Sequence, residues 1–138
     1  MRVERWVRSV AAALLLGSAA SGTAALAGCD RGVSVREAAA ALTGGNPDRG
    51  QRLIAGYGCG SCHTIPGVPG AQAKVGPPLA GLPGRAYIAG VLPNTPRNLE
   101  RWILDPPGVD SKTAMPNLGV SPNDARDIAA YLYTLRQQ

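Results

Sequence analysis

A five-residue segment, C-G-S-C-H at residues 59–63, restricts the folds open to this chain more than any other part of its sequence. Its two cysteines are three positions apart, and the histidine follows the second cysteine directly. Cysteines at this spacing can reach the two vinyl groups of one porphyrin and form thioether bonds, so the motif is typical of c-type haem attachment. The imidazole that follows lies under the ring, where it can bind the iron. The motif predicts one covalent haem c held by Cys59, Cys62 and His63.

Three other uses of the motif are less consistent with the chain. A thioredoxin-like redox pair is normally set in a βαβ unit, and no strand pattern surrounds these cysteines. A structural zinc site requires four ligands, and the remaining cysteine, Cys29, is 30 residues upstream. A structural disulfide would not need the adjacent histidine. The haem interpretation is therefore favoured.

The composition also calls for a cofactor. A chain of 138 residues indicates one domain, yet it contains no phenylalanine and only 4% aromatic residues, against 18 glycines and 12 prolines. A small domain with so few large side chains needs something else to fill its centre. The hydrophobic content of 45% excludes a disordered chain, and no apolar run is long enough for a polytopic membrane protein. We expect the haem-free chain to be largely unfolded.

The N-terminal residues have the order of an export signal. Residues 1–9 are basic, residues 10–16 are apolar, and small residues follow as far as Cys29. The segment L-A-G-C at 26–29 resembles the lipobox of bacterial lipoproteins, in which the peptide is cut before a cysteine that then carries lipid. This resemblance implies a signal peptide over 1–28, a lipidated Cys29, a tether over 29–45 and a location on the periplasmic side of the inner membrane.

Two alternatives for the leader remain open. The segment A-L-A at 25–27 also fits a simple A-x-A cleavage site, which would release a soluble protein, and an uncleaved anchor is a third interpretation. All three export the rest of the chain. From Cys29 onward there are 11 basic and 8 acidic residues without a basic cluster, which excludes a nucleic-acid partner.

Helix signals predict an all-α fold. A polar cap followed by proline begins a helix at Pro47, Pro96 and Pro122. The first helix is expected to end at the glycines of 56–60, the second at the D-P-P segment of 105–107, and the third near residue 135. Residues 35–42 could add two turns before a pair of glycines, and a glycine at position 50 suggests a close helix crossing. Residues 64–94 are rich in glycine and proline and are predicted to be a long loop without strands. We therefore expect three main helices, connected by long loops, around one haem.

The sixth ligand of the iron follows by elimination. His63 is the only histidine, so two-histidine ligation within the chain is excluded. The methionines are Met1, in the leader, and Met115, in a loop between two predicted helices. Met115 is therefore the expected ligand, with Lys74, Lys112, water or an open position as the alternatives. Ligation by methionine and histidine raises the reduction potential and leaves no position for a substrate.

Over residues 46–136 the order of these features resembles class I, mono-haem cytochromes c. After the haem motif come G-P-P-L at 76–79, G-R at 84–85, W-I-L-D-P at 102–106, the methionine, and a final helix ending in A-Y-L. The long stretch over 94–136 is similar to that of small, membrane-anchored bacterial cytochromes associated with terminal oxidases. The resemblance implies a cytochrome c domain over 46–138.

The resemblance also implies roles for further haem-contacting residues. The carbonyl of Pro77 is expected to accept the ring N–H of the proximal histidine, and Leu79 lies in the same segment. Arg85 is expected to meet a haem propionate. The indole of Trp102 is expected to pack beside Met115.

The predicted function is electron transfer rather than catalysis. We expect a one-electron carrier, with no small-molecule substrate, between a quinol-oxidising complex and a terminal oxidase or reductase. A haem peroxidase-type enzyme would need a vacant coordination position on the iron and an acid or base on the distal side of the haem. The sequence contains no second histidine that could act as this acid or base. A fixed cytochrome subunit of an oxidase or reductase complex is an alternative that the sequence does not separate from a carrier.

Overall fold

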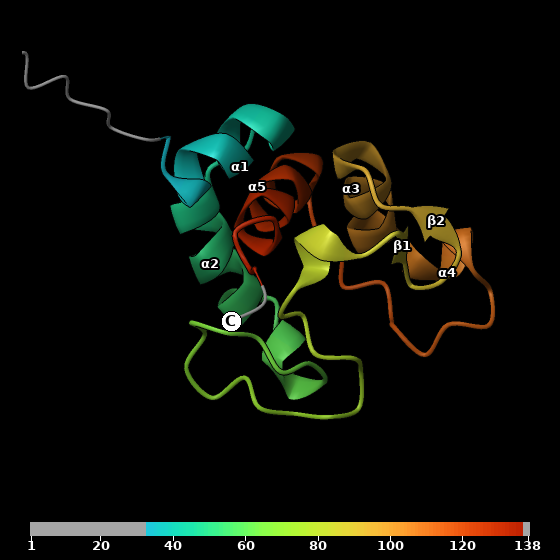
Figure 1. Cartoon of the computed structure of the whole chain (residues 1–138). Helices are drawn as coiled ribbons and strands as arrows, with labels where there is room; N and C mark the ends of the chain where they lie inside the picture. Colours follow the sequence, from blue (N-terminus) through green and yellow to red (C-terminus); the bar gives the residue numbers. More distant parts are fainter. Residues whose placement is uncertain (1–32, 137–138) are drawn as a thin grey trace, which may run out of the picture. The chain divides into compact units, whose positions relative to one another are not determined.

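The computed structural model describes residues 33–136, and it is built mainly from helices (Figure 1). In chain order these are α1 (Val35–Thr43), α2 (Pro47–Gly56), α3 (Pro96–Leu104), α4 (Pro106–Val109) and α5 (Pro122–Leu132). Single 3-10 turns cover Cys59–Ser61 and Leu82–Gly84, and a short antiparallel hairpin pairs β1 (Tyr87–Ile88) with β2 (Leu92–Pro93). The predicted signal peptide and Cys29 lie outside the described residues. Within 33–136, no helix has both the length and the apolar character needed to cross a bilayer.

The three predicted helices begin at the predicted residues. Asn46, Thr95 and Ser121 have extended backbones, and their side chains accept hydrogen bonds from backbone N–H groups in the first turns of α2, α3 and α5. Each cap is followed by a proline, whose fixed φ suits the first helical position. The local sequence is therefore sufficient to define where these helices start.

The core is organised by the crossing of α2 and α5. Gly50 of α2 is buried, and a Cβ atom at this position would overlap the backbone carbonyl of Asp127 in α5. The carboxylate of Asp127 accepts a hydrogen bond from the backbone N–H of Asn46 at 2.7 Å and pairs with Arg49. Glycine thus allows the two helices to approach closely, and charged side chains fix their register.

A second carboxylate reinforces the same crossing. Asp124 accepts a hydrogen bond from the hydroxyl of Tyr57 at 2.7 Å and also pairs with Arg49. Hydrogen bonds from Tyr57 and then Ser121, together with Arg49, hold the pKa of Asp124 below its ordinary value. The carboxylate therefore stays ionised in the folded protein at neutral pH.

Two alanine substitutions in α2 test the close approach. Gly50→Ala is expected to destabilise the protein by about 1–3 kcal/mol, because overpacking against a backbone carbonyl outweighs the gain in helix propensity. Gly56→Ala is the matched control, since no atom outside its own helical turn lies within 4 Å of a Cβ atom there, and it should be neutral or stabilising. Urea unfolding measures both free energies. Equal effects would show that Gly50 is not required for packing.

Helix α1 corrects the prediction of a tether over 29–45. Ala39 and Thr43 are buried, and α1 packs against α5. Arg36 forms an ion pair with Asp48 at 2.6 Å and donates a hydrogen bond to Gln51 at 3.1 Å. Residues 35–43 therefore belong to the folded unit, and a tether can extend no further than residue 34. The two helical turns and their glycine stop were predicted, but their packing was not.

The loop over 64–94 contains more structure than predicted. The structure places β1, β2 and one 3-10 turn in it, and Ile65, Val68 and Ala71 are buried. Helix α4 was also not predicted, because Asp105 followed by two prolines indicates only that α3 ends. The first of those prolines instead begins a new helical turn, and the N–H of Val109 bonds the carbonyl of Asp105 at 3.2 Å. The expectation of no strand in this loop was wrong.

Candidate functional site

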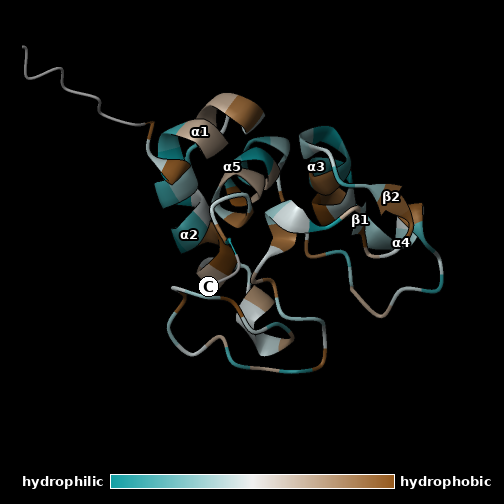
Figure 2. Ribbon diagram, in the orientation of Figure 1, coloured by the Kyte–Doolittle hydropathy of each residue, from teal (hydrophilic) through white to brown (hydrophobic). Residues whose placement is uncertain are grey.

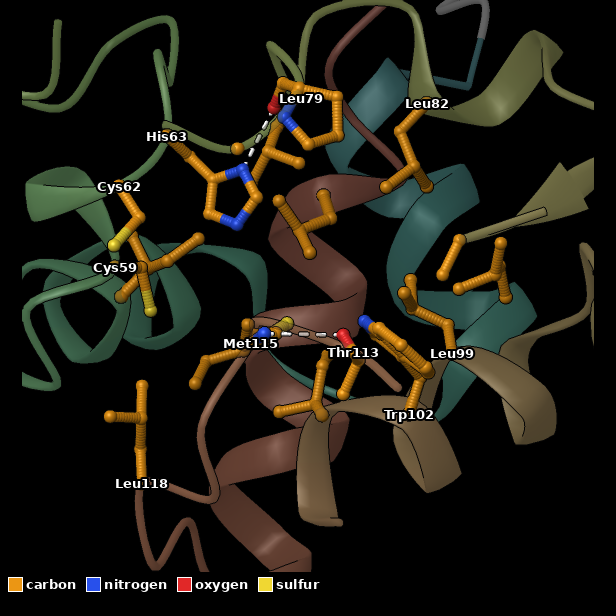
Figure 3. A pocket seen from close by; sticks show the side chains of 18 of the residues that line it. Cys59, Cys62, His63, Leu79, Leu82, Leu99, Trp102, Thr113, Met115 and Leu118 are labelled. Atoms are coloured by element: carbon orange, nitrogen blue, oxygen red, sulfur yellow. Dashed lines mark hydrogen bonds between the residues drawn. The ribbon is translucent and has the colours of Figure 1, made fainter. Parts of the chain in front are cut away.

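A cavity of about 530 Å³ lies between the helices and the long loops. Its walls are largely apolar, and it is within the range of volumes that ligand sites occupy. Figure 3 shows side chains from α3, from the loop before α5 and from the Cys59–Ser61 turn meeting around it. All eight cofactor-contacting residues expected from the sequence line this cavity: Cys59, Cys62, His63, Pro77, Leu79, Arg85, Trp102 and Met115.

The two thiols are presented by the turn that follows α2. Gly58 adopts a left-handed backbone (φ 71°), which ends the helix and starts the 3-10 turn Cys59–Ser61. The N–H of His63 then donates to the carbonyl of Cys59 at 3.0 Å. Both thiols are free rather than joined in a disulfide, and burial raises the pKa of Cys59. The geometry suits two separate thioether bonds to one planar group.

The imidazole of His63 is held in one orientation. Its Nδ1 lies 2.8 Å from the carbonyl oxygen of Pro77. A carbonyl can only accept a hydrogen bond, so Nδ1 carries a proton, and in the neutral ring Nε2 then has the lone pair with which to bind a metal. Figure 3 shows this hydrogen bond on the side of the ring away from the cavity. The role expected of the Pro77 carbonyl is thus present in the geometry.

Gly76 is needed behind the histidine ring. A Cβ atom at this position would overlap the imidazole, lying 2.7 Å from Nδ1. The N–H of Gly76 also donates to the carbonyl of Cys62 at 2.7 Å. The segment that carries Pro77 is therefore fastened to the haem motif itself, and only glycine fits between them.

Met115 lies across the cavity from His63 (Figure 3). Its backbone N–H donates to the hydroxyl oxygen of Thr113 at 3.1 Å. On the other side of the methionine, the amide of Asn117 donates to the carboxylate of Asp105 at 3.2 Å. The sequence indicated Met115 as a candidate iron ligand, but it did not reveal the hydrogen bonds of Thr113 and Asn117 on either side of it. The only available signal was a threonine two positions before the methionine, at a spacing typical of local turns.

Trp102 and Arg85 occupy the walls in different ways. Trp102 projects from α3 and is only 8% exposed, and Figure 3 shows it beside Thr113 near the methionine. The guanidinium of Arg85 donates to the carbonyl of Pro78 and to that of Ala80 at 3.1 Å. Arg85 therefore holds the segment that also carries the Pro77 carbonyl. Its predicted contact with a propionate stays a prediction.

The donor set fits a haem better than a bare metal ion. Two thiols, one imidazole nitrogen and one thioether sulfur face an apolar space too large for a single ion. Within residues 33–136, no group of three or more histidine, cysteine, aspartate or glutamate side chains could hold a metal ion. The zinc interpretation therefore has no support among the described residues.

Comparison with known proteins gives two matches. Residues 47–136, about two thirds of the chain, match the family model described as cytochrome c. The chain is also 32% identical over 90 residues to a protein named cytochrome c oxidase subunit 2 from Alkalihalophilus pseudofirmus. That alignment covers 64% of this chain and 25% of the relative, so the chain spans about a quarter of the relative's length. No solved structure matches.

Proposed function

Because the chain belongs to the cytochrome c family, we propose that it is a one-electron carrier of a bacterial respiratory chain. The observation that carries the proposal is the placement of His63 and Met115 on opposite sides of one cavity, with Cys59 and Cys62 at its edge. Family membership itself implies a covalently bound haem c and electron transfer. The axial pair, the respiratory role and the partners are proposed here.

The chain's own residues prepare the site for electron transfer. When bound, a haem supplies the Fe(II)/Fe(III) couple. The Pro77 carbonyl keeps the proton on Nδ1 of His63, and the turn at Thr113 fixes the backbone of Met115. Buried apolar residues of α3 and α5, including Leu99 and Ile128, keep water from the cavity wall. Little of the protein needs to move when the charge of the site changes.

The same ligand set argues against an enzyme. When a haem is bound, His63 and Met115 would hold its iron from both sides, which would leave no position for peroxide or another substrate. His63 is the only histidine in the chain, and it is hydrogen-bonded to Pro77, so it is not free to act as a distal acid or base. We therefore propose a redox protein donor and acceptor, meeting the haem edge through small, transient contacts.

A fixed subunit is the second candidate function. The relative in Alkalihalophilus pseudofirmus is named as an oxidase subunit and contains the matching segment within a much longer chain. This chain could supply the same kind of domain as a separate, permanently bound subunit of an oxidase or reductase. Affinity purification in mild detergent separates the two: a subunit should co-purify stoichiometrically with its complex, and a carrier should not.

Lipidation of Cys29 is the proposed means of localisation. The support is the lipobox-like segment at 26–29, together with its position a few residues before the folded unit. Several acyl chains hold a protein to a bilayer far more firmly than one. Mass spectrometry of the mature N-terminus should find an acylated Cys29 and a protein on the periplasmic side of the inner membrane. An unmodified N-terminus would contradict it.

A spectrum combined with a potentiometric titration tests the carrier proposal. The exported protein should be coloured, and its pigment should resist extraction by acidified organic solvent because the thioethers to Cys59 and Cys62 are covalent. The oxidised form should be low-spin and show the weak red band of methionine-ligated ferric haem. The titration should fit a single one-electron couple. A high-spin oxidised form at neutral pH would favour an enzyme.

Tryptophan fluorescence tests the position of Trp102. The other tryptophan, Trp6, lies in the predicted leader, so Trp102 is the only one expected in the mature protein. Because Trp102 lines the cavity, energy transfer to a bound haem should nearly extinguish its native emission. Unfolding in guanidinium should restore the emission several-fold. Bright emission from the native, haem-loaded protein would contradict this placement.

A further inference from the structure

Helix α1 has an outward face that is apolar and unpartnered among residues 33–136. Ala38 and Ala41 are exposed, and Val35 and Leu42 are 37% and 56% exposed. Val33, just before the helix, is 73% exposed. Figure 2 shows hydrophobic residues along α1. Exposed apolar residues that gather on one helix face mark a contact surface more often than scattered ones do.

The other long helices expose a different kind of surface. The exposed residues of α2 include Asp48, Arg49 and Arg52, and those of α5 include Asn123 and Arg126. The outward face of α1 carries one charged residue, Glu37, at its edge. The backbone N–H of Ser34 donates to the Glu37 carboxylate at 2.8 Å, and this bond lowers the pKa of Glu37. Among the helices of residues 33–136, only α1 exposes large apolar side chains, those of Val35 and Leu42.

Side-chain contacts attach α1 to the other helices on its inward side. Arg36 pairs with Asp48 and donates to Gln51, and its guanidinium lies 6.0 Å from the ring centroid of Tyr131 in α5. Ala39 is buried on the inward side. These contacts tie α1 to both helices of the central crossing, so its outward face has a set direction relative to the rest of the domain.

The position of the face in the chain indicates what covers it. Val33 is four residues from Cys29, so the two lie at most about 14 Å apart even when the chain is fully extended. Acyl chains on Cys29 would bring α1 to the bilayer before any other described helix. We propose that the outward face of α1 lies on the surface of the lipid bilayer, an inference that rests on the proposed anchor at Cys29.

A small apolar face is sufficient because the anchor is covalent. Two valines, a leucine and two alanines would bind a membrane weakly from solution. Attachment through Cys29 makes the contact intramolecular, with an effective concentration on the order of millimolar for a short tether.

This contact would set the direction of the haem cavity. Helix α2 runs from the end of α1 to the turn that carries Cys59, and its 10 residues span about 15 Å. Figure 1 shows α1 and the haem-attachment turn at opposite ends of α2. With α1 on the lipid, the cavity faces away from the bilayer, where another redox protein can approach it.

Site-directed spin labelling of the full, lipidated, haem-loaded protein tests the contact. In that protein Cys29 is acylated and Cys59 and Cys62 are in thioether bonds, so an introduced cysteine is the only free thiol. Leu42→Cys places the label on the α1 face. Ala38→Cys is a second variant on the same face, and Ala55→Cys, exposed near the far end of α2, is the matched control.

The readout is the label's collision rate with oxygen, which partitions into lipid, relative to a water-soluble nickel chelate. In vesicles of phosphatidylethanolamine and phosphatidylglycerol, the ratio should be several-fold higher at positions 42 and 38 than at position 55. Equal ratios in protein that remains vesicle-bound would overturn the membrane contact but not the anchor. Strong dipolar broadening would show that labels on two copies of the chain lie close together. The α1 face would then contact a second copy of the chain, and the membrane contact would be overturned. An unmodified Cys29 would overturn both the anchor and the contact.

Discussion

Protein that lacks both thioether bonds is expected to lose its helical fold rather than keep an open cavity. The double substitution Cys59→Ala/Cys62→Ala removes both attachment points of the haem. The cavity measures about 530 Å³, and without a haem its apolar lining loses the packing contacts that the ring would supply. A typical small domain has a total stability of only about 5–15 kcal/mol, so such a loss can unfold it. The chain has no phenylalanine with which to refill the space.

Circular dichroism measures this result directly. The double variant should show little helix at 25 °C and no cooperative thermal transition, whereas the haem-loaded parent shows both. Ser61→Ala is the control within the same motif, because Ser61 is exposed and its hydroxyl bonds only local groups. It should fold and bind haem as the parent does. A double variant that contains no haem yet keeps native helix content and a sharp transition would show that the fold is independent of its cofactor.

The starts of the main helices could be predicted because their signals are local. A polar cap, a proline and an apolar stripe lie within a few residues of one another at Asn46, Thr95 and Ser121. Each of these three side chains accepts a hydrogen bond from a backbone N–H group in the first turn of its helix. The docking of α1 could not be predicted in this way. It depends on Arg36 meeting Asp48, Gln51 and Tyr131, and such meetings follow from the crossing of α2 and α5 rather than from any short segment.

The candidate site also combines features that the sequence predicts with contacts that only the structure reveals. Its candidate donor residues could be named from the sequence because cysteine, histidine and methionine are scarce: among residues 30–138 there are two cysteines, one histidine and one methionine. The groups that orient these donors are backbone carbonyls and common polar residues, which scarcity does not reveal. The carbonyl of Pro77 was expected only through family resemblance. The hydrogen bonds from Arg85 to the neighbouring carbonyls required the structure.

Replacing Met115 is expected to have the largest effect on the redox chemistry. Axial ligands set haem potentials over a range of about 0.8 V, and a thioether favours the reduced iron. Met115→Ala should therefore lower the midpoint potential by on the order of 100 mV or more, and the oxidised iron should become high-spin and bind added imidazole. Met115 is partly buried within the cavity wall, so truncation also opens a path for small ligands.

Met115→His separates the loss of a ligand from the loss of the thioether. A second imidazole should restore a low-spin iron and exclude added imidazole, yet the potential should stay low because sulfur is absent. Potentiometric titration and the red absorption band measure both properties. If Met115→Ala leaves the potential and the band unchanged, another group holds the iron. Lys74 and Lys112 are then the residues to replace, since Lys112 lies in the same loop as the methionine.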